Sequence, residues 1–133
     1  MRVNVRSLKW VIVPPLGYLA FVLPVLVSPL PRHYATVLFQ TYTDASYTLG
    51  WPNGVLLFFL GVLLGFFGFQ REGLAGCLSV ILLPILAVIE MIKDGTSHNL
   101  WPFEFMAYAI MAAIVVIGSL TGQKLRGLRE RRN

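Results

Sequence analysis

The chain alternates between long apolar stretches and short polar segments. Four stretches contain no Asp, Glu, Lys or Arg, and they cover residues 10–31, 45–70, 73–89 and 105–123. A helix rises about 1.5 Å per residue, so about 20 mostly apolar residues cross a hydrocarbon core of about 30 Å. Barrel strands would be shorter and would alternate polar with apolar residues. The pattern therefore predicts an all-α, polytopic membrane protein.

We expect a single domain over residues 1–133, built as a four-transmembrane-helix bundle. The predicted spans are residues 10–27, 52–69, 74–92 and 102–120, followed by a basic tail at 121–133. The dipeptides Trp51-Pro52 and Trp101-Pro102 open the second and fourth spans, because proline suits the first helical turn and tryptophan suits the headgroup boundary. Composition agrees, since 13% of the residues are charged, against about 25% in a soluble domain.

The positive charges predict an orientation. An even number of crossings puts both termini and the turn at 70–73 on one side of the membrane. By the positive-inside rule this side is cytoplasmic, and the bacterial inner (plasma) membrane is the expected location. The outer side then holds only Arg32 and Lys93 of the 11 basic residues. The cytoplasmic side holds Arg2, Arg6, Lys9, Arg71, Lys124, Arg126, Arg129, Arg131 and Arg132.

Small residues indicate how the helices pack. Gly54, Gly61, Gly65 and Gly68 fall on one face of the second span and would let another backbone approach closely. The contact is either within the chain or between two chains, so a homo-oligomer or another membrane-protein partner stays open. The single cysteine, Cys77, lies in the middle of the third span, where we interpret it as a packing residue.

A group of polar residues is predicted at the outer mouth of the bundle. If the third span reaches its full length, Glu90 lies about one turn inside the outer boundary, where an acid is not fully solvated. Glu104 and Tyr108 share the small, polar face of the fourth span. The candidate cluster comprises Glu90, Asp94, His98, Asn99, Glu104 and Tyr108.

Glu90 and Glu104 each have a functional and a structural interpretation. Glu90 is either a proton or cation site, or an acid near the interface that pairs with Lys93 or a hydroxyl group. Glu104 follows a helix-starting proline, so it either serves the site or stabilises the helix N-terminus. The aromatics of the first outer loop, Tyr42 among them, either lie at the headgroup boundary or fold over the mouth as a lid.

The sequence contains no enzyme, cofactor or metal signature. His33 and His98 lie in different loops without ligand spacing, so we predict no metal site. We find no P-loop, no nucleophile elbow and no dinucleotide fingerprint. A lipid-acting enzyme would have to use His98 as a base, oriented by Asp94 or Glu104. The basic tail favours contact with anionic lipid as well as topology, whereas nucleic-acid binding is disfavoured because no base-stacking module accompanies the charge.

The segment Thr96-Ser97-His98-Asn99-Leu100-Trp101-Pro102-Phe103-Glu104 resembles a TSHNLWPFE-like loop of uncharacterised small bacterial four-helix membrane proteins. The resemblance implies a small multi-pass membrane protein and brings no activity with it. We therefore expect a structural or accessory protein whose outward-facing recognition surface lies at residues 94–104. The alternative is a small oligomeric solute or ion transporter that uses Glu90.

Reporter fusions test the predicted topology. A fluorescent protein fused after Asn133 should fold in the cytoplasm, and alkaline phosphatase inserted at Gly95 should be active outside it. The same reporters exchanged between the two sites serve as controls and should be inactive. If the phosphatase at Gly95 is inactive because it lies in the cytoplasm, the four-span topology is wrong.

Overall fold

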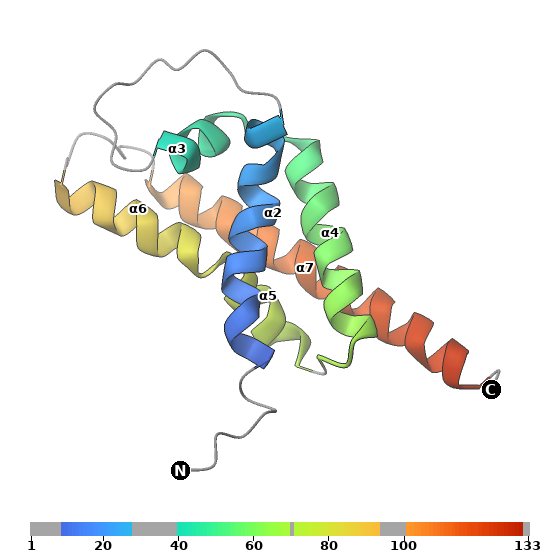
Figure 1. The fold of residues 1–133 in the computed structure, drawn as a ribbon. Coiled ribbons are helices and arrows are strands. Elements are labelled where there is room, and N and C mark those ends of the chain that lie inside the picture. Colours follow the sequence, from blue (N-terminus) through green and yellow to red (C-terminus); the bar gives the residue numbers. More distant parts are fainter. Residues whose placement is uncertain (1–8, 28–39, 70, 94–100, 132–133) are drawn as a thin grey trace, which may run out of the picture.

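The computed structural model describes residues 9–27, 40–69, 71–93 and 101–131. Every regular element in this part of the chain is a helix, which confirms the predicted all-α class. In chain order the helices are η1 (Lys9–Ile12), α2 (Val13–Val27), α3 (Gln40–Tyr47), α4 (Trp51–Phe66), α5 (Glu72–Val80), α6 (Leu82–Lys93) and α7 (Trp101–Glu130). They form the bundle shown in Figure 1.

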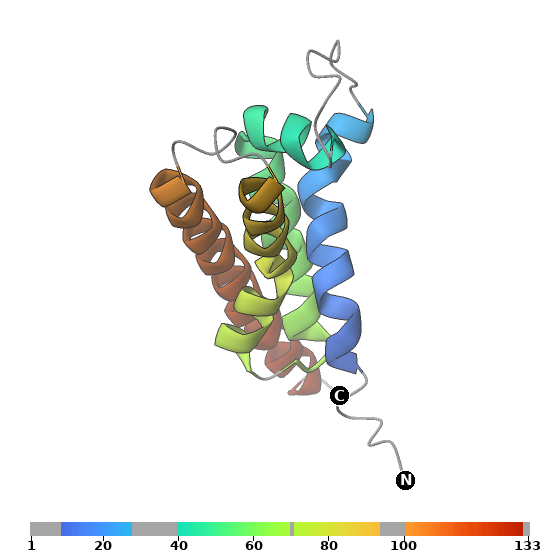
Figure 2. The same ribbon diagram turned by 90° about the vertical axis from the view of Figure 1, so that its left-hand side faces the viewer.

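Successive passes of the bundle run between the same two ends, which Figures 1 and 2 show from two sides. At one end α2 and α6 finish, α4 and α7 begin and α3 packs against α2, and we call it the cap end. At the other end α2 and α5 begin while α4 and α7 finish, and we call it the basic end. The helices α2 and α4 pack against each other, and α7 crosses behind them obliquely.

Three helical segments of the described chain are long and apolar enough to cross a membrane. They are Trp10–Val27, Glu72–Lys93 and Pro102–Glu130, with 18, 22 and 29 residues. The fourth apolar helix, α4, has 16 residues and is about 24 Å long, which is shorter than a typical hydrocarbon core. Large apolar side chains such as Phe59, Ile110 and Ile117 are exposed on the bundle surface. A membrane protein is therefore the class that length and composition support.

Backbone geometry explains where α4 begins and ends. The N–H of Gly50 donates to Oδ1 of Asn53 at 3.1 Å, which satisfies a polar group at the helix start. At the other end the N–H of Gly68 donates to Gly65 O (3.2 Å) and the N–H of Phe69 to Leu64 O (3.0 Å). This is a Schellman turn, and Gly68 has the positive φ of 84° that the turn requires. The prediction that Gly68 shares the glycine face of the helix is therefore wrong.

The third predicted span is not one continuous helix. Pro84 has no N–H to donate to the carbonyl of Val80, and its ring crowds that carbonyl. The chain accordingly breaks between α5 and α6 at Ile81, whose N–H turns back to Leu78 O at 3.4 Å. The last predicted span also differs, because α7 continues ten residues past Leu120 to Glu130. Part of the predicted tail is thus a direct extension of a spanning helix.

The most extensive helix contact joins α4 to α7, which run in the same direction. A Cβ atom on Gly61 would lie 2.3 Å from Val115 O, and one on Gly65 would lie 2.0 Å from Ser119 O. The approach is reciprocal, because a Cβ on Gly122 would lie 2.1 Å from Val62 O. Gly118 meets Phe58 O at 2.3 Å in the same way. Both helices carry a small-xxx-small pair, so the two backbones touch.

Gly65→Ala should separate the two helices. The added methyl group has no room beside the Ser119 carbonyl, so we expect a loss of about 1–3 kcal/mol in the free energy of unfolding, typical of overpacking. Gly54→Ala is the matched control, since its Cβ would meet Ile114 Cδ1 at an ordinary 3.7 Å. Unfolding in detergent micelles, followed by circular dichroism, measures both. Equal transitions for the two variants would contradict the contact.

Candidate functional site

The buried carboxylate of Glu90 is at the centre of the cap end. It lies on the face of α6 that also buries Leu83 and Ala87, and it is only 5% exposed. The hydroxyl group of Thr43, on α3, donates to Glu90 Oε1 at 3.3 Å. A buried acid needs such polar partners because burial removes its hydration. Glu90 therefore points into the bundle beneath α3.

Two tyrosines make a second contact between α3 and the bundle. The hydroxyl groups of Tyr42, on α3, and Tyr108, on α7, form a hydrogen bond, and both side chains are buried. The Tyr42 ring lies 6.0 Å from that of Phe21, between ring centroids. Burial raises the pKa of Tyr42, and the hydrogen bond from Tyr108 opposes this rise only in part. Tyr42 thus stays neutral and able to donate its proton.

Together Tyr42, Thr43, Glu90 and Tyr108 form what we call the cap cluster. It joins α3 to both α6 and α7. The helix α3 has eight residues, and an isolated helix of this length is unstable in water. Ala45, which is fully buried, adds an apolar contact. The cap cluster and the packing of α3 against α2 therefore hold α3 at the end of the bundle, where Figure 2 shows the helix.

The structure brings some of the predicted residues together. Glu90 and Tyr108 belong to the cap cluster. Glu104 lies half-buried in the first turn of α7, where the helix N-terminus favours an acid, and its charge helps to raise the pKa of Tyr42. Asp94, His98 and Asn99 lie outside the described residues, so the proposed chemistry of His98 stays a prediction.

Two polar residues, the partly buried Thr43 and the buried Asn53, were not among the predicted site residues. Thr43 lies in a segment read as a loop, and its polar, weakly periodic sequence gave no signal of a helix. Asn53, which is 1% exposed, donates from Nδ2 to the carbonyl of Phe21 at 2.7 Å. That carbonyl lies next to the carbonyl of Ala20, which Pro24 deprives of its helical donor. The sequence did contain a signal for this contact, namely Pro24 in one helix and the amide side chain of Asn53 in the next.

A cavity of about 270 Å³ lies between α4 and α7 at the cap end. Its lining is almost entirely apolar and contains no member of the cap cluster. The side chain of Asn53, its most polar wall, already bonds within the protein. The volume is near the lower end of the roughly 300–1,000 Å³ of small-molecule sites, and the apolar lining gives no evidence for a polar ligand. The lining residues are Leu49, Gly50, Asn53, Gly54, Ala107, Ile110, Met111 and Ile114.

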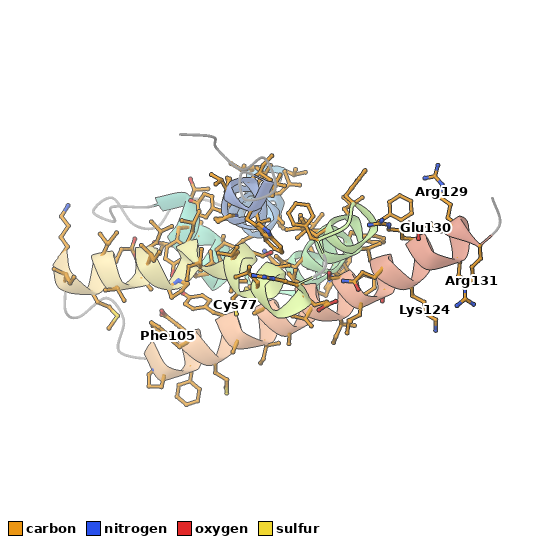
Figure 3. All side chains as sticks on the ribbon, turned by 90° about the horizontal axis from the view of Figure 1, so that it is seen from below. Cys77, Phe105, Lys124, Arg129, Glu130 and Arg131 are labelled. Atoms are coloured by element: carbon orange, nitrogen blue, oxygen red, sulfur yellow. The ribbon has the colours of Figure 1, made fainter. Side chains whose placement is uncertain are left out.

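Metal and thiol chemistry find little support in the described part of the chain. Within it, no three His, Cys, Asp or Glu residues gather closely enough to hold a metal ion. His33 and His98 lie outside it. Cys77 is exposed on the surface of α5, where Figure 3 labels it. The prediction that Cys77 packs inside the bundle is therefore wrong.

No protein-family model, no curated protein and no solved structure matches this chain. The class of the protein rests on its own geometry. Three of its apolar helical segments can cross a membrane, and a buried carboxylate lies beneath a short polar helix at one end. These features define an α-helical membrane protein with a polar cap.

A double-mutant cycle on Tyr42→Phe and Tyr108→Phe tests the cap cluster. Each single substitution leaves a buried hydroxyl without its partner and should cost about 1–3 kcal/mol. The coupling energy should be about 0.6 kcal/mol, with an upper limit near 1.7, as in other membrane proteins. Unfolding in micelles measures the cycle. Thr48→Val, at an exposed hydroxyl of the same segment, is the control and should change stability by less than about 0.5 kcal/mol. If the losses in the free energy of unfolding from the two tyrosine substitutions simply add, the hydrogen bond between Tyr42 and Tyr108 is contradicted.

Proposed function

We propose that this chain is a four-pass protein of the bacterial inner membrane with both termini in the cytoplasm. The helix α4 provides the fourth crossing. Its 16 residues continue into an apolar Schellman turn that ends with the buried Phe69, and its backbone touches the spanning helix α7. Both features support a full crossing although the helix itself is short.

The charges of the described residues support the proposed orientation. The cap end holds Lys93 beside the acids Asp44, Glu90 and Glu104. The basic end has an excess of positive charge, as cytoplasmic segments next to membrane helices have. Its described basic residues include Arg71, Lys124, Arg126, Arg129 and Arg131.

For the protein's role we propose that of an accessory protein, which presents the cap end and the neighbouring segment 94–104 to another membrane protein. The observation that carries this proposal is the use of the buried polar groups. The hydroxyl groups of Thr43 and Tyr42 form hydrogen bonds with Glu90 and Tyr108, respectively. These bonds fix a polar helix at the edge of the bundle. A rigid polar surface favours recognition, because less freedom is lost on binding.

The second candidate is a proton or cation site at Glu90. Its burial in a bundle of apolar helices favours this function, since acids inside membranes often mark ion pathways. The two candidates demand different properties of the same side chain. An accessory role needs Glu90 as a hydrogen-bond acceptor, whereas an ion site needs its negative charge.

Glu90→Gln separates the two functions, because the amide oxygen can still accept the Thr43 hydrogen bond while the charge is gone. A photo-crosslinking residue at the exposed position Thr48 reports contact with a partner in cells. For an accessory role, Glu90→Gln should keep a discrete adduct, and Thr43→Val with Tyr108→Phe should remove it. The same crosslinker at Gly127, where no atom of the described residues lies within 4 Å of a Cβ, is the control and should not give that adduct.

Flux through vesicles measures the other candidate. If Glu90→Gln abolishes a proton- or cation-driven flux while the protein still inserts, the ion site replaces the accessory role. An adduct from Thr48 that survives loss of the cap cluster would also count against the accessory role, because the surface would then not depend on a fixed α3.

A further inference from the structure

The end of α7 extends beyond the bundle. The helix has 30 residues and is about 45 Å long, against a hydrocarbon core of about 30 Å. Figure 1 shows its final turns passing the end of α4. Since α7 is also a candidate spanning segment, these turns come to lie at the surface of the membrane at the basic end.

One side of these turns is bound to the protein. Gln123 Nε2 donates to Glu72 Oε1 at 2.6 Å and to Phe69 O at 3.3 Å. Arg126 pairs with Glu130 at 2.8 Å. The guanidinium carbon of Arg129 lies 5.8 Å from the centroid of the Phe66 ring. The two Gln123 bonds fix the rotation of α7 about its axis, whereas the Arg126–Glu130 pair lies within the helix itself.

The other side carries Lys124, Leu125, Leu128 and Arg131, which we call the Lys124–Arg131 face. The spacing of four and three residues aligns Lys124, Leu128 and Arg131 on the helix. Figure 3 shows Lys124 and Arg131 on one side of α7 and Arg129 on the other. Leu125 and Leu128 are 47% and 52% exposed. Among the described residues, neither Lys124 nor Arg131 has a carboxylate partner within ion-pair distance.

We propose that the Lys124–Arg131 face binds the headgroups of anionic phospholipids. Lys124 and Arg131 contact the phosphate groups, and the two leucines insert at the boundary between headgroups and acyl chains. Charge complementarity selects this ligand, because two cations that have no ion-pair partner in the described part of the chain meet a surface that carries negative charge. The leucines between them favour a lipid surface over a soluble anion. The proposal needs α7 to cross the membrane but does not depend on the accessory role or on orientation.

The experiment places a reporter beside this face. In a Cys77→Ser background, Gly127→Cys carries an environment-sensitive fluorophore, since a Cβ there has none of the described residues within 4 Å. The protein is reconstituted into vesicles of phosphatidylcholine alone or with phosphatidylglycerol in both leaflets. We expect blue-shifted emission only with phosphatidylglycerol, and reversal of the shift in 1 M salt, where the Debye length is about 3 Å.

Two charge-matched double variants test the face itself. Lys124→Gln with Arg131→Gln should lower the ratio of docked to undocked reporter about fivefold for each charge removed. Arg126→Gln with Arg129→Gln removes the same charge from the opposite side and should leave the ratio within twofold. An equal loss of docked reporter in the two variants would falsify the proposal. So would reporter emission that changes with neither phosphatidylglycerol nor salt when the face carries no substitution. The salt experiment uses neither variant. It therefore still tests the proposal if one of the variants fails to fold.

Discussion

The contact between the backbones of α4 and α7 is the constraint on which the rest of the bundle depends. Lipid provides no hydrophobic force between helices, so helices associate through close packing and polar bonds. Gly61 and Gly65 meet Gly118 and Gly122 across this contact and leave no space for a side chain. The same α7 supports α5, and α4 supports α2. The glycine contact thus sets the positions of the two helices on which α5 and α2 pack.

Polar bonds complete the two ends of the bundle in different ways. At the cap end buried hydroxyl groups and Glu90 hold a short helix that could not be stable alone. At the basic end Gln123 ties α7 to the turn between α4 and α5, where Trp10 packs edge-on against Phe69 at 4.9 Å. The first arrangement fixes a surface, and the second fixes the direction in which the final turns of α7 project.

The features of the fold that depend on local sequence pattern could be predicted from the sequence. Uninterrupted apolar runs predicted the helices, and the Trp-Pro pairs predicted where α4 and α7 begin. Hydropathy does not register the lost hydrogen bond at Pro84, so the break after Val80 was missed. A prediction from hydropathy also ends a span near the first charged residues. Lys and Arg are good helix formers, however, and α7 continues through them. The bond between Tyr42 and Tyr108 joins residues 66 positions apart, and only tertiary structure brings them together.

The break at Ile81 divides the third pass into two unequal halves. The helix α5 packs closely on α7, with a Cβ on Gly76 only 2.7 Å from Ala112 O, whereas α6 makes far less contact with α7. The position of α6 therefore depends on its junction with α5, on its contact with α2 and on the Thr43 bond to Glu90. Resistance to local unfolding is then uneven along the molecule. Amide protons of α6 and α3 would exchange with solvent as one cooperative unit, before those of α4, α5 and α7.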